Sequence, residues 1–314
     1  SLSVSLASDL GANVTTSGTQ TYSGAVTLST SNTLTTTSNG NISFGASIGN
    51  SSAQNLTLDT GLTSGTISVT GAVGSGTALG TLTITKSAGT TFSSTVNASV
   101  VTLTATTGSI TFNGALTATT LNTAASGYNL VLNAGGTITD AVTFANTGTV
   151  TLGDASSDSI TFTGGLTLLA PSQANIAGTV QTTNNTISIG DSNTSIVLTA
   201  NTTISSGTAG LTLGGTVNGA FSLTLNSSGT TTLSSTVGNS TALTSVTTDS
   251  GGTIAINGAS VRTSGTQTYN DAATLGADTT LTTTNNNVTF NGTLNSDGGT
   301  PRSLTLALGT GTLV

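Results

Sequence analysis

Aspartates are the residues of this chain with the most obvious chemistry, because carboxylate oxygens bind calcium and act as acids or bases. Asp154 and Asp158 lie in the segment GDASSD, and Asp271 and Asp278 form a second, wider pair. Calcium needs six to eight oxygen ligands, and the dense glycine–aspartate repeats that supply them in some solenoids do not occur here. We therefore expect these aspartates to cap turns and expect no cofactor, with calcium at Asp154 and Asp158 left open.

A catalytic site for polysaccharide cleavage would need clustered carboxylates beside an arginine or lysine. Arg262 and Asp271 are the nearest such pair in the sequence. Both lie in a repeated segment whose other copy has Thr15 and Gly24 at the equivalent positions. Because the pair does not recur with its own repeat, we expect no catalytic residues, and the sequence predicts a protein that is not an enzyme.

The composition excludes several further classes of protein. The 314 residues include three cations, ten aspartates and no histidine or cysteine. An imidazole base, a thiolate nucleophile and a nitrogen or sulfur metal site are therefore excluded. Three cations cannot line a groove that follows nucleic-acid phosphates, and no apolar run is long enough for a membrane-spanning helix. We expect neither nucleic-acid binding nor membrane insertion.

A repeated motif links two distant parts of the chain. TSGTQTY occurs at Thr16–Tyr22 and again at Thr263–Tyr269, and the likeness extends over residues 14–58 and 261–306. Gln20 and Tyr22 correspond in this repeat to Gln267 and Tyr269. An exposed tyrosine would stack on a sugar, whereas a tyrosine at a corner of the fold would bond its hydroxyl to the backbone. We favour the second interpretation.

The elements that position these residues are short strands. Apolar–polar–apolar triplets recur along the whole chain, for example at Leu56–Leu58, Ile110–Phe112 and Leu211–Leu213. Such alternation places the apolar pair on one face of a strand and threonine or serine on the other. Clusters rich in glycine and asparagine separate the triplets and favour turns. The pattern predicts strands of three to five residues joined by links of about two to eight residues.

Many short strands with one apolar face are typical of a β-solenoid, in which stacked coils bury a common core. The spacing of the phenylalanines predicts roughly 20 residues per coil and about 15 coils, in one continuous domain over residues 1–314. We interpret the chain as a mature segment or fragment of a larger protein. The predicted core ladder consists of Phe44, Phe112, Phe144, Phe162 and Phe290, with Phe92 in the same pattern.

The motif G-x-Q-x-Y-x-x-A-x-T-L, at Gly18–Leu28 and Gly265–Leu275, resembles the repeats of filamentous haemagglutinin-like, large exported bacterial adhesins. This resemblance implies a right-handed parallel β-helix that is secreted and acts in attachment or biofilm, outside the cell or on the surface of a bacterium. The secretion signatures NPNL and NPNG of that family have no counterpart here, which favours a shaft segment. The resemblance implies no catalytic residues.

The composition of the expected outer faces predicts what the chain binds. Nearly uncharged threonine, serine and asparagine faces can pack together without repulsion, so we expect self-association, end to end or side by side, into a structural filament. The alternative is an adhesin shaft that binds polysaccharide or a host surface. Ice binding through the threonine rows of Thr81–Thr85 and Val101–Thr104 is a further alternative. It would require a coil-by-coil register, which the variable spacing argues against.

Overall fold

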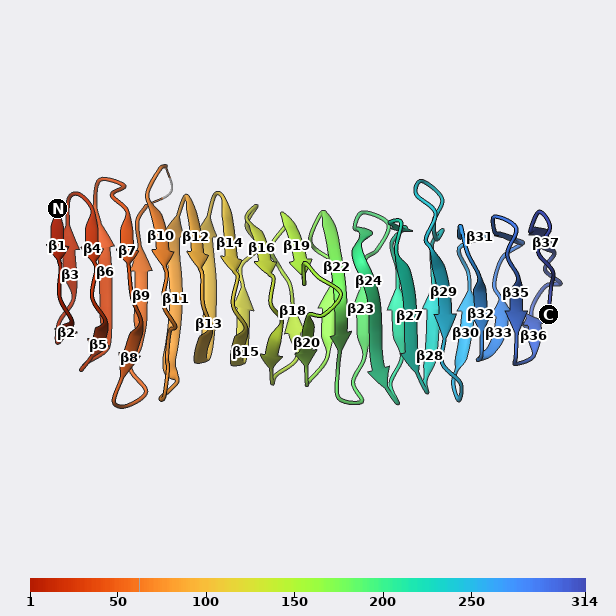
Figure 1. Cartoon of the computed structure of the whole chain (residues 1–314), viewed down its shortest axis with the longest axis horizontal. Coiled ribbons are helices and arrows are strands. Elements are labelled where there is room, and N and C mark those ends of the chain that lie inside the picture. Colours follow the sequence, from red (N-terminus) through yellow and green to blue (C-terminus); the bar gives the residue numbers. More distant parts are fainter. Residues whose placement is uncertain (62) are drawn as a thin grey trace. The chain divides into compact units, whose positions relative to one another are not determined.

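The computed structural model describes residues 1–61 and 63–314, and these residues contain strands and turns but no helix. The strands fall into two compact units, Ser1–Thr151 (unit 1) and Leu152–Val314 (unit 2). In each unit, parallel strands of successive coils lie side by side in chain order (Figure 1). The two units contain about 15 coils of about 21 residues each, which confirms the predicted all-β parallel solenoid. The continuity of one domain over residues 1–314 stays a prediction.

Unit 1 shows how the sequence pattern becomes a coil. Neighbouring strands of its first sheet pair in register, so that Tyr22 lies opposite Phe44 and Thr91 opposite Thr111. The apolar residues at the ends of each triplet point into the solenoid, and the middle residue points outward. The strands of this sheet are β1 (Leu2–Val4), β4 (Gln20–Tyr22), β7 (Ile42–Phe44), β10 (Thr66–Val69), β12 (Gly89–Phe92), β14 (Ser109–Phe112) and β16 (Asn129–Leu132).

Two further sheets complete the coils of unit 1. The second sheet begins with β2 (Ser8–Leu10), β5 (Val26–Leu28) and β8 (Ile48–Asn50). The third contains β3 (Val14–Thr16), β6 (Asn32–Thr36), β9 (Leu56–Asp59), β11 (Leu79–Ser87), β13 (Val96–Thr106) and β15 (Leu116–Thr123). Two short strands follow, β17 (Gly136–Ile138) and β18 (Val142–Thr143), and β17 pairs with the start of β15.

The strands of unit 2 are arranged in the same way. Its first sheet contains β20 (Ser159–Phe162), β22 (Gln173–Gln181), β24 (Ser195–Gly207), β27 (Ser222–Ser227), β29 (Ser245–Thr248), β32 (Gln267–Tyr269) and β35 (Val288–Phe290). The second contains β21 (Leu166–Leu168), β23 (Ile187–Ile189), β25 (Leu211–Leu213), β28 (Thr230–Leu233), β30 (Thr253–Ile256), β33 (Ala272–Leu275) and β36 (Leu294–Ser296). The third contains β26 (Val217–Asn218), β31 (Ser260–Arg262), β34 (Thr279–Thr282) and β37 (Leu304–Ala307).

The predicted strand length of three to five residues is wrong for several strands. β13 has 11 residues and β24 has 13. In β13 the alternation breaks at Ser99 and Val100, which both point away from the core, yet pairing with β15 continues on either side of them. The chain thus turns a corner without a glycine–asparagine turn. A prediction from apolar–polar alternation alone therefore places the end of this strand too early.

One corner of the coil contains hydroxyl side chains that hydrogen-bond the turning main chain. Thr36 donates to Gly40 O at 2.6 Å, Thr60 to Gly65 O at 2.8 Å, and Ser206 to Ala209 O at 2.7 Å. All three side chains are buried. Each hydroxyl thus adds a hydrogen bond to the turning main chain, and Gly65 O accepts a further one from Ala88 N of the next coil.

Candidate functional site

The repeated motif forms a buried hydrogen-bond centre. Gln20 is fully buried, and its Nε2 donates to Thr35 O at 2.9 Å and to Val14 O at 3.2 Å. The Tyr22 hydroxyl donates to Gln20 Oε1 at 3.1 Å. The amide thus joins its own coil to the next one and also fixes the ring of Tyr22.

The second copy repeats this geometry in unit 2. Gln267 Nε2 donates to Thr282 O at 2.9 Å and to Val261 O at 3.1 Å, and Tyr269 donates to Gln267 Oε1 at 3.0 Å. Burial raises the pKa of Tyr22 to about 12 and raises that of Tyr269 as well, so both phenols stay protonated. The hydroxyl partner is a glutamine side chain, not the expected backbone group, and a buried ring cannot stack on a sugar.

The predicted core ladder is placed as follows. Phe44, Phe92, Phe112, Phe144 and Phe162 are buried, whereas Phe290 is half-buried. Three ring pairs on successive coils are stacked, namely Tyr22 with Phe44 at 5.0 Å between centroids, Phe92 with Phe112 at 4.9 Å, and Tyr269 with Phe290 at 4.8 Å. The stacking follows from the in-register pairing of the strands that carry these rings.

Asp154 and Asp158 lie in one turn. Asp158 Oδ2 accepts hydrogen bonds from the backbone amides of Asp154, at 2.9 Å, and Ala155, at 2.8 Å. Loss of solvation and the neighbouring Asp158 carboxylate raise the pKa of Asp154. Within residues 1–61 and 63–314 no group of three or more acidic, histidine or cysteine side chains is gathered as a metal site.

The structure does not bring Arg262 and Asp271 together as an ion pair. Arg262 is exposed, and its Nη1 donates to Asn239 O at 3.4 Å. Asp271 is only 1% exposed; its Oδ1 accepts a hydrogen bond from Gly252 N at 2.9 Å, and its Oδ2 has no partner in the described part of the chain. Burial is the main cause that raises the pKa of Asp271, and the Asp249 carboxylate adds to the rise.

We expect the substitution Asp271→Asn to raise the free energy of unfolding by about 1 kcal/mol at neutral pH, because it removes a buried charge with one unpaired oxygen. A folded-state pKa above the unfolded value means that Asp271 stabilises the fold when protonated, and that this contribution is lost as the pH rises through the folded pKa. The advantage of asparagine should therefore shrink as the pH falls through the folded pKa of Asp271, and should be gone below the ordinary carboxyl value of about 4. Chemical denaturation at several pH values measures this difference in the free energy of unfolding between the variant and the wild type.

The exposed Asp9 gives the control for this prediction. The substitution Asp9→Asn should leave the free energy of unfolding within about 0.5 kcal/mol of the wild-type value at every pH. An Asp271→Asn variant that is less stable than the wild type at neutral pH would show that the carboxylate is ionised and favourably bound in the fold.

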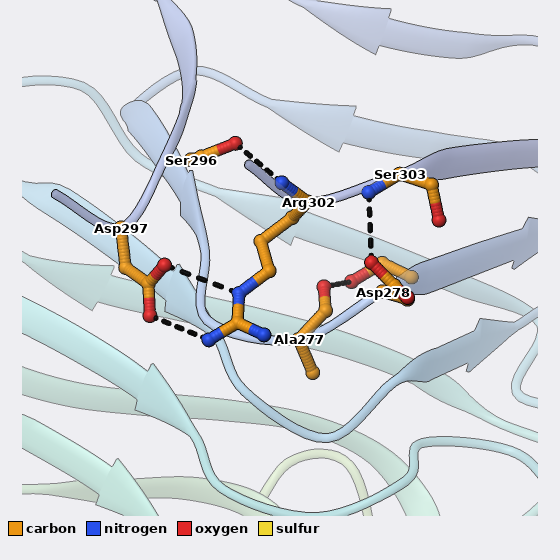
Figure 2. Close-up of polar contacts among 7 residues, drawn as sticks. Ala277, Asp278, Ser296, Asp297, Arg302 and Ser303 are labelled. Atoms are coloured by element: carbon orange, nitrogen blue, oxygen red, sulfur yellow. Dashed lines mark hydrogen bonds and ion pairs between the residues drawn. The ribbon is translucent and has the colours of Figure 1, made fainter. Parts of the chain in front are cut away.

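Asp278 lies near the one ion pair of the described residues (Figure 2). Arg302 donates from Nε to Asp297 Oδ1 at 3.1 Å and from Nη2 to Asp297 Oδ2 at 3.0 Å. Asp278 Oδ1 accepts a hydrogen bond from Ser303 N at 2.9 Å. Hydrogen bonds from Arg302 and Ser303 lower the pKa of Asp297 and Asp278, respectively. Both carboxylates are therefore engaged in holding the loop before β37.

The threonine rows proposed from the sequence are only partly in register, since Thr81 lies opposite Val100. Thr83 lies between Thr57 on the preceding coil and Thr102 on the following one. These three threonines are aligned, but this row does not continue as threonine over many coils, because it ends at Asn122. The extra residues are accommodated in the corners, while main-chain pairing keeps the strands aligned.

Sequence reasoning missed the inter-coil role of asparagine. Asn39, Asn184 and Asn285 adopt positive φ, and each accepts a backbone hydrogen bond from the next coil through Oδ1. Asparagine is one of the few residues with a side chain that tolerates this conformation. The sequence signal for this inter-coil hydrogen bond is an asparagine that precedes a glycine by the length of one coil.

Comparisons with family models, with curated proteins and with solved structures found no match. No helix in the described ranges is long and apolar enough to cross a membrane. The fold therefore defines the class of protein: this is a β-solenoid repeat protein.

Proposed function

We propose that this chain is a structural, non-enzymatic segment of a bacterial cell-surface or extracellular fibre. The observation that carries the proposal is the unbroken parallel pairing of neighbouring coils. In the first sheet of unit 1 each strand from β1 to β16 pairs with the strand of the next coil. Such a ladder resists bending and protease attack, because every coil is held by its neighbours on both sides.

The surface supports self-association as the mechanism. Thirteen charged side chains in 314 residues leave long stretches of threonine, serine and asparagine on the outside. Surfaces of this kind do not repel each other at close range. Copies of the chain are therefore expected to join into filaments or lateral bundles.

Electron microscopy of the purified native material at several protein concentrations tests this function. We expect filaments or bundles whose abundance rises with concentration. Separate particles at every concentration, together with a monomeric mass in solution, would contradict self-association.

A second candidate function is an adhesin shaft that binds polysaccharide or a host surface. The observation that favours it is the register of outward hydroxyl side chains, such as Thr57, Thr83 and Thr102. Retention of the chain on insoluble polysaccharides, measured beside the microscopy, distinguishes this function from a purely structural one.

A further inference from the structure

Six successive coils of unit 2 have a threonine at the same outward position, and Ser159 of β20 precedes them in register. Main-chain pairing places the six threonines on successive coils of β22, β24, β27, β29, β32 and β35, each opposite the next. We call this set the six-threonine row: Thr179, Thr203, Thr224, Thr247, Thr268 and Thr289. All six side chains are partly exposed.

The hydroxyls of the six-threonine row are free. In the described residues none of them forms a hydrogen bond within the protein. The corner hydroxyls of Thr36, Thr60 and Ser206 differ, because each of those donates to a main-chain carbonyl. The row therefore presents both the donor and the acceptor capacity of every hydroxyl to water.

The positions on either side of the row are polar and almost uncharged. The outward residues two positions before Thr203, Thr224, Thr247, Thr268 and Thr289 are Asn201, Ser222, Ser245, Thr266 and Asn287. Those two positions after are Ser205, Asn226, Asp249, Asn270 and Asn291. Asp249 is the one charge among these ten, and its Oδ1 accepts a hydrogen bond from Ser227 N. No charged side chain projects from the row itself, so a neutral ligand fits this face.

The row is also rigid and evenly spaced. Neighbouring strands of a sheet are about 4.8 Å apart, so the six hydroxyls repeat at that distance. Threonine has a restricted χ1 angle, and the paired main chain fixes its Cα, so ordering these side chains costs little entropy. Each side chain offers a methyl group and a hydroxyl side by side. A rigid array of this kind matches a regular lattice better than a single small molecule.

We propose that the six-threonine row binds ice. The oxygen rows at the surface of an ice crystal repeat at a distance close to the strand spacing, and ice is neutral. Water molecules ordered by the free hydroxyls and held around the methyl groups provide the layer through which the protein joins the lattice. The activity is independent of the structural function, since it uses one face of unit 2 and requires no association between copies.

The structure argues against a carbohydrate as the occupant of this face. Carbohydrate recognition commonly uses an exposed aromatic ring, but all three tyrosines, Tyr22, Tyr128 and Tyr269, are buried. A solid water lattice needs no aromatic ring.

The test is growth of ice in the presence of the purified full chain. We expect shaped ice crystals and inhibition of ice recrystallisation. The double variant Thr224→Tyr and Thr268→Tyr should require at least about tenfold more protein for the same inhibition, because contacts along one row act together. Tyrosine keeps a high strand propensity, so the fold should persist, as circular dichroism and thermal unfolding would check.

The matched control is the double variant Thr212→Tyr and Thr274→Tyr in β25 and β33. These threonines also point outward in unit 2, but their row is interrupted by Ala255. The control should keep wild-type ice activity. Absence of ice activity in the wild type, equal loss in both double variants, or retention on crystalline polysaccharide without any effect on ice would each overturn the proposal. Self-association into filaments is tested separately by electron microscopy, and its outcome does not depend on the ice experiment.

Discussion

Replacing Gly136 with alanine is expected to lower the free energy of unfolding by about 4 kcal/mol or more, which would open the coils around β17. Gly136 has φ of +134°, a conformation that residues with a Cβ rarely adopt. A Cβ at this position would lie 2.0 Å from Leu116 O and 2.7 Å from Leu116 N. Both are main-chain atoms of the preceding coil, so relief requires the two coils to separate.

Gly49 is the matched control for Gly136. It lies in β8, also in unit 1, has no positive φ, and has no heavy atom within 4 Å of a built Cβ. The substitution Gly49→Ala should leave stability unchanged or raise it by up to about 1 kcal/mol, because alanine restricts the unfolded chain. Chemical denaturation and limited proteolysis of the two variants measure the difference. Equal stability of both variants would show that the coils around β17 can move apart without cost.

Replacing Gln267 with leucine is expected to lower the free energy of unfolding by about 3 kcal/mol. Leucine has a similar volume but removes the donor to Thr282 O and Val261 O and the acceptor for the Tyr269 hydroxyl. These partners are too deep in the fold for water to replace the amide easily. The loss should appear in urea denaturation followed by circular dichroism, and Gln20→Leu should repeat it in unit 1.

Two further variants isolate the buried amide. Gln181 is half-exposed and donates to Thr161 Oγ1 at 3.0 Å, so Gln181→Leu should cost less than about 1 kcal/mol. The substitution Tyr269→Phe removes one hydrogen bond and should cost about 1 kcal/mol. In the double variant Gln267→Leu and Tyr269→Phe the two costs should not add, because both substitutions break the same bond. Additive costs would contradict the shared hydrogen bond.

The sequence predicts the coil well because the coil depends on alternation. A triplet such as Leu211–Leu213 can bury both leucines only on one face of a strand. Successive coils must then stack to cover that apolar face. The register of the outward threonines was not predictable in the same way. It depends on which residues enter the corners, and Ser99 and Val100 show that a corner can form without any turn residue.

The role of the repeated motif was also only partly predictable. The identity of TSGTQTY in both copies indicates a shared structural role for Gln20 and Tyr22. It does not reveal that their side chains bond to each other, since both are polar residues of types that are also common on surfaces. The burial of Asp271 was missed for the same reason, because local sequence does not show which side of a corner faces the core.

The distance along the chain between paired strands has a consequence for how the protein folds. Leu2 pairs with Gln20, Thr90 with Ile110, and Leu82 with Leu56, so paired residues of neighbouring coils are 18 to 26 positions apart. Closing such a loop costs a similar entropy in every coil, because the cost grows only slowly with loop length. Folding can therefore begin at one coil and proceed by addition of the next, and its rate should depend on the first contacts formed and not on the number of coils.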